Sequence, residues 1–349
     1  MPFTAQELEN AANAALAFHK DTPKVVAQTI QDKPLYAAMT RAEKMFPGGK
    51  DQITVRVKGI YSTTIQGFAA DDSVSYGNPA NIKQAVFNWY LIHSGITFTM
   101  HELLKSGISI TDSTTGERTS QASNAEKIML ANLLEDKIED MNEGTERGMN
   151  EMYWLDGTQD AQLSPGVTSF VVDDPTADLN VGGLSQIQHT WWRNRADLAI
   201  ALGSGPETGA VLNKLQYEFR QLRRYGGLKR SMWLAGSDMM DRIEKELKAQ
   251  GYYTQTGWAN KGKIDGSVSD LAFKGNDIMY DPTLDDLGWS KRLYVLDTDA
   301  IKPMVIDGEA RKDHAPARPE NVYAFFRART WVGGLTCNRR NSSGVYAFT

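Results

Sequence analysis

The segment from His101 to Lys105, with the sequence HELLK, begins as the helix of a zinc protease begins. Such a helix binds Zn²⁺ through two imidazoles one turn apart, and no second histidine follows His101 at that spacing. The remaining histidines are scattered along the sequence and predict no ligand set: His19, His93, His189 and His314. We therefore interpret His101 as a residue at the start of a helix and expect no metal site.

A glycine-rich segment, 203–209, has the sequence GSGPETG and precedes a run with helical periodicity. A phosphate-binding loop needs a Lys followed by Ser or Thr, and a dinucleotide-binding loop needs Gly-x-Gly-x-x-Gly spacing. Both patterns are absent here, and Pro206 removes one backbone N–H group that would bind a phosphate. We interpret the segment as a surface loop and assign no cofactor and no cofactor-binding residue.

Carboxylates occur in patterns that only partly match metal sites. Three acidic doublets lack the alternating oxygen ligands and the closing Glu of a calcium loop: Asp71-Asp72, Asp173-Asp174 and Asp285-Asp286. We interpret them as loop and turn residues, with a divalent ion at a subunit contact as the alternative. Glu135, Glu139 and Glu143 follow one another at i, i+4 spacing, but the Glu-x-x-His of a di-metal bundle is absent. They indicate a solvated acidic face or a contact with a basic partner surface.

The nucleophile patterns are equally incomplete. Cys337 lies beside Arg339 and Arg340, whose charges would lower the pKa of its thiol, but no Gly-x-Ser-x-Gly or Cys/His signature accompanies it. A buried Cys acting as a small hydrophobic residue is the simpler interpretation. The pair Trp191-Trp192 could stack on bases or sugars, although packing in a core or interface is the commoner role. We therefore assign no catalytic residue and expect no enzymatic activity.

Composition excludes several classes of protein. The 349 residues carry 38 Lys and Arg against 43 Asp and Glu, a net charge of −5, and are 41% hydrophobic with one Cys. A single Cys excludes a disulfide framework. Because the sequence contains no long apolar run, we expect neither a signal peptide nor a membrane helix. A sequence pI near 5.7 without basic tracts argues against a protein that binds nucleic-acid phosphates directly. The length allows about two domains.

The N-terminal third predicts a helix, an arm and a ribbon. A capping-box pattern at Thr4 and Glu7 opens a helix that extends to Phe18, after which Pro23 and Pro34 interrupt the chain into an irregular arm. From Ile53 apolar residues alternate with polar ones, and a second extended run covers 82–99. We expect one long two-stranded ribbon with an irregular, polar tip at 69–79. At ~3.3 Å per residue its arms would reach about 50 Å.

The strongest helical pattern covers Asn124 to Trp154. Apolar or small residues recur on one face at intervals of three or four: Leu130, Leu134, Ile138, Met141, Thr145, Gly148 and Met152. Gly144 and Gly148 in its interior predict a bend or a close approach by another backbone. A preceding capping-box pattern at Thr99 and Glu102 predicts a short helix.

The remainder predicts a compact α/β unit and a C-terminal sheet. Between 205 and 306 we expect a helix from about Thr208 that ends at 225–227, a strand at 232–235, a helix capped by Ser237, and strands at 271–280 and 293–296. The C-terminal strands would cover 322–332, 335–338 and 345–348, with Gly333-Gly334 as a break. These elements are too long and thin to complete their burial in one compact monomer, which indicates an assembly.

This order of elements resembles the major capsid protein of tailed bacteriophages, which has the Hong Kong 97-type fold that is also found in encapsulins. Short segments along most of the chain look like one group of phage capsid proteins: 46–50, 66–83, 98–104, 220–227, 280–288 and 315–319. The resemblance implies an α+β chain that self-assembles into hexamers and pentamers of an icosahedral head enclosing double-stranded DNA.

The resemblance also implies a division of the chain and a set of partners. The parts would be an N-terminal arm (1–50), an extended loop formed by the β-ribbon (51–98), a peripheral domain (99–204) with a spine helix (123–154), an axial domain (205–306) and a C-terminal return to the peripheral domain (307–349). Copies of the chain itself would be the main partner, with scaffolding, portal and decoration proteins as further ones, and without a membrane. The protein would be located in the virion after assembly in the bacterial cytoplasm.

The candidate contacts between subunits are Asp71, Asp72, Tyr76, Arg223 and Arg224. The acidic tip of the ribbon suits a basic patch on a neighbouring copy. Two alternatives remain: an encapsulin-like compartment shell with an enzyme cargo, and a stand-alone enzyme whose site would be a pocket with convergent polar groups.

Overall fold

The computed structural model describes residues 31–61, 63, 65–73, 76, 81–99, 101–102, 124–224, 231–249, 271–317 and 324–349. The side chains of 103–136, 271, 315–317 and 325 lie outside this description, as does the expected helix at 4–18. Contacts divide the chain into two compact units. We call the one that contains Tyr90–Met149 and Val305–Gly333 the helix-and-sheet unit, and the other, containing Asp32–Trp89, Asn150–Met304 and Gly334–Thr349, the α/β unit.

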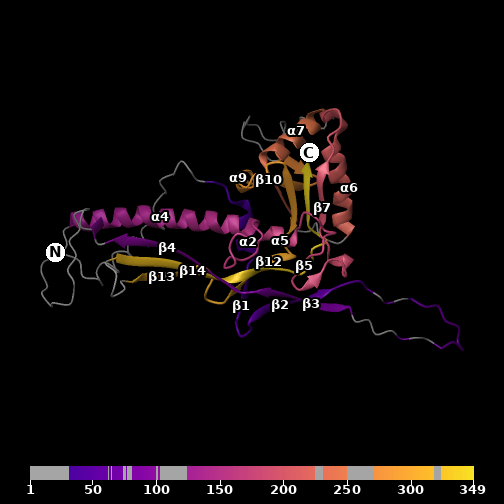
Figure 1. Cartoon of the computed structure of the whole chain (residues 1–349), viewed down its shortest axis with the longest axis horizontal. Helices are drawn as coiled ribbons and strands as arrows, with labels where there is room; N and C mark the ends of the chain where they lie inside the picture. Colours follow the sequence, from indigo (N-terminus) through magenta and orange to yellow (C-terminus); the bar gives the residue numbers. More distant parts are fainter. Residues whose placement is uncertain are drawn as a thin grey trace. The chain divides into compact units, whose positions relative to one another are not determined.

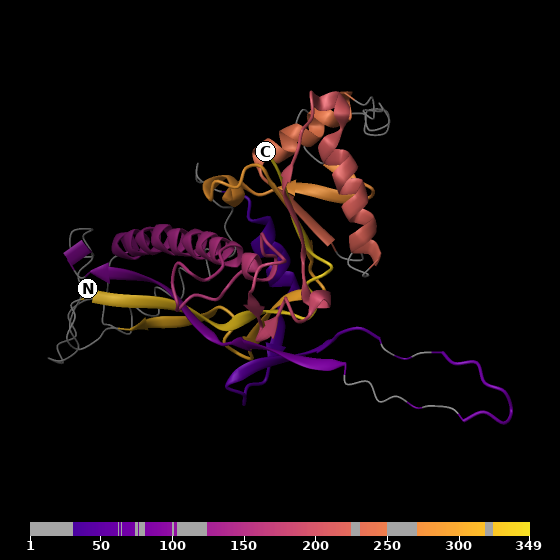
Figure 2. The ribbon, with the colours of Figure 1, turned by 45° about the vertical axis from the view of Figure 1, so that its right-hand side comes forward.

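The helix-and-sheet unit is built on one long antiparallel strand pair. Strand β4 (Tyr90–Thr99) pairs with β14 (Ala324–Cys337) in unbroken register, from Tyr90 opposite Gly333 to Thr99 opposite Ala324. Strand β13 (Lys312–Ala317) also pairs with β14. Helix α4 (Asn124–Trp154) runs along this sheet (Figures 1 and 2). The 31-residue helix expected from periodicity is confirmed in both of its bounds.

Contacts along β4 hold α4 on the sheet. Thr145 donates a hydrogen bond from Oγ1 to Ser94 Oγ at 2.8 Å, and Lys137 Nζ lies 2.7 Å from Glu102 Oε2. Ile138 and Met141 are buried, as the periodicity predicts. Thr99 Oγ1 accepts a hydrogen bond from the Glu102 N–H at 3.2 Å, which confirms the expected helix cap.

The sequence predicts a bend or a close approach by another backbone at the two glycines of α4. For the described residues, the close approach is wrong. A Cβ added to Gly144 or Gly148 would meet no atom within 4 Å, because both face open space. Periodicity identified the helix, but the glycines mark no contact within the described residues.

The α/β unit contains a six-stranded sheet with the order β7-β15-β11-β8-β10-β9. Its strands are β7 (Arg195–Ile200), β15 (Gly344–Phe348), β11 (Arg292–Asp297), β8 (Ser231–Ala235), β10 (Asn276–Tyr280) and β9 (Leu271–Phe273). Helices α6 (Ala210–Arg224) and α7 (Ser237–Ala249) pack against this sheet (Figure 2). Their apolar faces share one core with the sheet, in which Leu215, Ile243 and Trp233 are each 1% exposed. The helices and strands expected here are therefore confirmed.

The sheet is wider than the interval 205–306 predicts. Strand β15 pairs with β11 and with β7. The last strand of the chain therefore lies in the α/β sheet and does not pair with β14, the strand that precedes it in sequence. Strand β12 (Ile301–Ile306), expected within the α/β interval, instead lies between β1 (Lys44–Phe46) and β14 in the other large sheet. The alternating patterns identify these strands but not their neighbours.

The structure differs from the sequence-based expectation at Pro34 and at Gly333-Gly334. Pro34 begins helix α2 (Pro34–Ala42) rather than interrupting the chain, because a proline in the first turn has no intrahelical N–H bond to lose. Strand β14 continues through Gly333-Gly334 without a break. A Cβ on Gly334 would lie 2.5 Å from the Asn88 carbonyl oxygen, so the glycine permits a close approach within a strand.

A buried polar network joins the last turns of α4 to the α/β sheet. Trp154 Nε1 donates a hydrogen bond to Asp281 Oδ2 at 2.8 Å. Asp281 directly precedes helix α9 (Pro282–Asp286). Asn150 Oδ1 accepts from the Tyr36 N–H at 2.8 Å, and its Nδ2 donates to Thr283 Oγ1 at 2.7 Å. The network therefore connects α2, α4 and α9 through direct hydrogen bonds.

Substitution of Asn150 by Ala tests this network. We expect the free energy of unfolding to fall by about 3 kcal/mol, because the change removes two buried hydrogen bonds and leaves their partners unmatched. Chemical denaturation measures the difference. Glu151→Ala, at the exposed next position of α4, is the control and should stay within about 0.5 kcal/mol of the native chain. A similar loss in both variants would contradict the role of Asn150.

The buried Asp281 carboxyl also makes a pH-dependent prediction. Burial raises its pKa, against the opposing effect of its hydrogen bonds to Trp154 and Thr283. The folded chain therefore binds the proton more tightly than the unfolded chain, and this stabilisation is lost as pH rises through the raised pKa. The difference in unfolding free energy between the native chain and Asp281→Asn should thus shift in favour of the native chain as the pH falls from 7 toward about 4, the ordinary pKa of an aspartate. A difference that is independent of pH would contradict this assignment.

Candidate functional site

The most exposed feature of the α/β unit is a loop carried by a short strand pair. Strand β2 (Gln52–Lys58) pairs antiparallel with β3 (Ile82–Asn88), from Gln52 opposite Asn88 to Lys58 opposite Ile82. The described residues between them, 59–61, 63, 65–73, 76 and 81, which we call the distal loop, extend beyond the end of this pair (Figures 1 and 2). A hydrogen bond of 3.0 Å from the Gly59 N–H to the Asn81 carbonyl closes the base of the loop.

The expected ribbon is shorter than its sequence pattern predicts. Only the first part of the extended run 82–99 pairs with β2; after Trp89 the chain continues as β4, which pairs with β14. The paired arms therefore span about 23 Å at ~3.3 Å per residue, rather than 50 Å. The extended, largely apolar run continues across Trp89, so the pattern cannot show that the strand changes partner.

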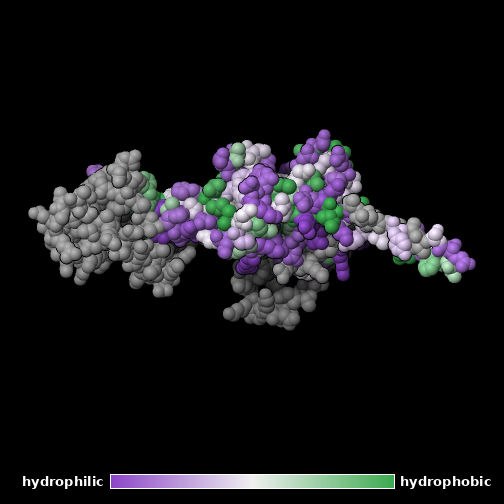
Figure 3. Space-filling view, turned by 90° about the horizontal axis from the view of Figure 1, so that it is seen from below, coloured by the Kyte–Doolittle hydropathy of each residue, from purple (hydrophilic) through white to green (hydrophobic). Residues whose placement is uncertain are grey.

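The distal loop and its ends expose large apolar side chains. Ile65 is fully exposed and Tyr76 is 95% exposed; others more than 60% exposed are Ile60, Tyr61, Phe68 and Ile82. Figure 3 shows green residues beside purple ones along the loop. Single exposed apolar residues are ordinary, but a concentration in one projecting segment indicates a contact surface. Sequence reasoning missed Ile60, Tyr61, Ile65 and Phe68 because it placed the candidate contacts of this loop only in the polar tip at 69–79.

The acidic pair at the tip of the loop has a structural role as well. The Ala69 N–H donates to Asp72 Oδ2 at 2.9 Å, and the Asp72 N–H donates to the Ala69 carbonyl at 3.0 Å. Asp72 therefore closes a turn. All three tip residues named from the sequence, Asp71, Asp72 and Tyr76, are exposed.

The two expected arginines lie on another element. Arg223 and Arg224 occupy the last turn of α6, where cations favour the negative end of the helix dipole, and both are exposed. Helix α6 packs on the six-stranded sheet, whereas the distal loop begins at the separate β2–β3 pair. The structure therefore does not bring the five residues together into one cluster.

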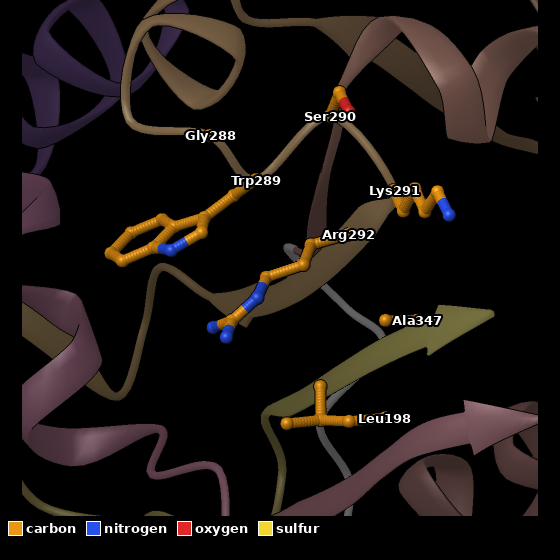
Figure 4. A pocket seen from close by; sticks show the side chains of 7 residues that line it. All are labelled: Leu198, Gly288, Trp289, Ser290, Lys291, Arg292 and Ala347. Atoms are coloured by element: carbon orange, nitrogen blue, oxygen red, sulfur yellow. The ribbon is translucent and has the colours of Figure 1, made fainter. Parts of the chain in front are cut away.

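A shallow depression of about 270 Å³ lies at the edge of the α/β sheet, and its side chains do not converge (Figure 4). Arg292 binds Asp173 through two hydrogen bonds of 2.9 and 3.0 Å and lies 4.9 Å from the Trp289 ring centroid. Lys291 points away from Arg292, over the ring of Phe348 at 5.5 Å. The depression thus lacks the convergent polar groups that the enzyme alternative predicts.

The other chemical motifs have structural roles in the described chain. Burial raises the pKa of the Cys337 thiol to about 12, outweighing the neighbouring arginines, and Cys337 is fully buried, as expected. The Thr176 hydroxyl and N–H hydrogen-bond to Asp174 and lower the pKa of that carboxyl. Asp285 accepts a hydrogen bond of 2.7 Å from the Tyr280 hydroxyl. Among the described residues, no group of three or more His, Cys, Asp or Glu could hold a metal ion.

Hydropathy adds one observation about the helices. Of those in the described part of the chain, none combines the length and the apolar character that a membrane span requires.

Comparison with known proteins reveals likeness only at the level of structure. No family model matches the chain, and no curated protein matches its sequence. The capsid asymmetric unit of cyanophage A-1(L) matches with a TM-score of 0.63 at 14% identity, over 93% of this chain and 95% of that chain. The mature capsid of bacteriophage PhiM1 matches with a TM-score of 0.56 at 8% identity, over 94% and 90% of the two chains. The capsid of cyanophage P-SCSP1u matches with 0.56 at 9% identity, over 94% and 91%.

Nearly complete coverage of both chains shows that the likeness concerns the whole fold. The chain therefore has the α+β, Hong Kong 97-type fold of phage capsid proteins, which confirms the fold that the sequence resemblance implies.

The single thiol offers a direct test of the core around Cys337. We expect no reaction with a thiol reagent at pH 8 in the native chain, since the group is fully buried and its pKa is about 12. After denaturation one thiol per chain should react. Absorbance of the released chromophore measures both states, and rapid labelling of the native chain would contradict the burial.

Proposed function

We propose that this chain is a major capsid protein, a structural subunit that assembles into hexamers and pentamers of the icosahedral head of a tailed phage. The observation that carries the proposal is the Hong Kong 97-type fold over almost the whole chain. The distal loop supports it independently, because its apolar side chains have the exposure of an unoccupied contact surface. The copy that covers this surface would be a second chain of the same kind.

The energetic argument for self-assembly rests on repetition. Burial of apolar surface contributes roughly 25 cal/mol for each Å² removed from water, so one loop that docks a few side chains gives a weak contact. In a closed shell each subunit both donates a loop and receives one, and the contacts act together. A chain whose loops dock weakly one at a time would therefore form a stable particle.

The parts of the chain would divide the work as the resemblance implies. The arm and the extended loop, whose strand pair ends at Asn88, would reach neighbouring copies. The peripheral domain with its spine helix would form the body of the shell. The axial segment would be the six-stranded sheet with α6 and α7, which includes β7 and β15 and leaves out β12, and it would meet its copies around the capsomer axis. Arg223 and Arg224, exposed at the end of α6 within that axial segment, are proposed contacts there.

The remaining partners follow from the same proposal. The shell would enclose double-stranded DNA without sequence-specific binding, which agrees with a net charge of −5 and no basic tract. Scaffolding, portal and decoration proteins would be further partners, and assembly in the bacterial cytoplasm would precede location in the virion. The role is structural and requires no catalysis.

Assembly of the purified chain, with and without its loop surface, tests the proposal. We expect the native chain to form closed particles by light scattering on a sizing column and by negative-stain microscopy. Ile65→Ser/Phe68→Ser should stay folded but fail to close particles, because it removes exposed apolar surface without touching the core. Ser73→Ala, an exposed substitution in the same loop, is the matched control and should assemble normally.

The outcomes separate the alternatives. Closed particles that contain an enzyme rather than DNA would favour an encapsulin-like compartment. Normal particles from Ile65→Ser/Phe68→Ser would contradict the role of the loop. A native chain that stays monomeric even at high concentration and with a scaffold present would contradict the proposed function itself.

A further inference from the structure

The backbone at the base of the distal loop lies directly against an aromatic ring. A Cβ added to Gly59 would come within 2.9 Å of Cε2 of the Trp191 indole, and within 3.1 Å of its Cζ2 and Nε1. Gly59 does not have a positive φ, so the backbone conformation alone would accept another residue. It is the indole that leaves room only for glycine at the first residue of the loop.

The Trp191 ring is held where it meets Gly59. It belongs to a 3₁₀ turn, η2 (Thr190–Trp192), and its ring centroid lies 5.3 Å from that of His189 and 6.0 Å from that of Trp192. The indole therefore has neighbouring rings that restrict its movement away from an added methyl group.

A buried arginine, Arg340, holds the η2 turn that carries Trp191. Arg340, 1% exposed, donates from NH1 to the Trp192 carbonyl at 3.1 Å and from Nε to the Phe170 carbonyl at 2.6 Å. Its NH2 donates to Asn194 Oδ1 at 3.1 Å. Trp192 itself is buried and donates from Nε1 to the Val181 carbonyl at 3.1 Å. The turn whose Trp191 indole faces Gly59 is thus held by the buried side chains of Arg340 and Trp192.

Further contacts fix the strands on either side of the loop base. Lys58 Nζ lies 4.1 Å from the ring centroid of Tyr61, which holds the first loop residues against the end of β2. The Val86 N–H donates to the Gly182 carbonyl at 3.0 Å, in the turn between β5 (Asn180–Val181) and β6 (Leu184–Ser185). These contacts restrain the β2–β3 pair and leave Gly59 as the point where the loop takes its direction.

We propose that the contact between Gly59 and the Trp191 indole is a clamp that sets the direction in which the distal loop leaves the β2–β3 pair. Trp191 is then a positioning residue: it touches the base of the loop, not the exposed side chains that dock. The clamp is a property of the single chain. Its consequence for assembly rests on the proposed function, because only a loop held in one direction presents its apolar side chains in register with a neighbouring copy.

Distance measurements between spin labels test the clamp directly. Labels at Thr63→Cys and Asp178→Cys, both exposed positions of the α/β unit, report the direction of the loop base, and buried Cys337 stays unlabelled. Labelled chain is diluted with unlabelled chain so that only distances within one chain are measured. We expect Gly59→Ala to shift or broaden the distance distribution by several ångströms relative to the labelled native chain.

Compensation distinguishes the clamp from a general loss of packing. A Leu side chain ends at about the positions of the indole Cδ1 and Cδ2 and lacks the Cε2, Cζ2 and Nε1 atoms that the added methyl would meet, so Gly59→Ala/Trp191→Leu should restore the native distribution. Gly67→Ala is the matched control, since a Cβ there meets nothing within 4 Å. Trp191→Ala keeps Gly59 and should broaden the distribution by removing the wall; it serves if Gly59→Ala does not fold. An unchanged distribution in both Gly59→Ala and Trp191→Ala would overturn the clamp.

The same variants in the particle assay separate the clamp from the proposed function. Altered distances together with malformed or missing particles support both. Altered distances with normal particles would leave the clamp standing and overturn its role in assembly. A native chain that forms no particle would contradict the proposed function and leave the distance test unaffected.

Discussion

A two-stranded ribbon does not hold its own shape in water, and the exposed end of the α/β unit depends on how this constraint is met. The β2–β3 pair buries Val57 and Ala85 against Leu184 and Trp192, in a small core separate from that of the six-stranded sheet. Behind that core lies Arg340, whose burial lowers its pKa to about 10 and leaves it charged at neutral pH. Because its described partners are neutral amides and carbonyls, the charge is stabilised by hydrogen bonds and by the Trp192 ring 5.9 Å away.

The two ends of the ribbon therefore have opposite requirements. Its base is packed closely enough that Gly59 and Gly182 each have an aromatic side chain within 3.0 Å of an added Cβ. Its distal loop leaves Ile65 and Tyr76 almost completely exposed and Phe68 67% exposed. A closely packed base holds the loop in one direction before its exposed apolar side chains meet a partner. Less conformational entropy is then lost when the loop makes that contact.

Periodicity predicted the elements whose burial follows a single face, and it failed where a residue's role depends on a distant neighbour. The length of α4 and the strands of the α/β core followed from spacing alone, since Ile138, Met141 and Val211 lie where helical periods place them. The change of partner at Trp89 left no trace in the sequence, because one extended, largely apolar run continues through both strands. Gly59 and Gly334 could not be interpreted because the atoms that require glycine, in Trp191 and Asn88, lie far away in sequence. At the candidate site the tip residues were identified, whereas the apolar surface beside them was not.

The register between β4 and β14 has a mechanical meaning. Ten consecutive residue pairs connect the two strands, and β3 and β4 are separated by Trp89 alone, so a pull on the ribbon reaches β4 along the backbone. Force along the axis of paired strands loads all their hydrogen bonds at once in shear, whereas force across the strands would open them one after another. Each bond is worth only about 1 kcal/mol net, but bonds that share a load must fail together. The helix-and-sheet unit is thus suited to bear tension along β4.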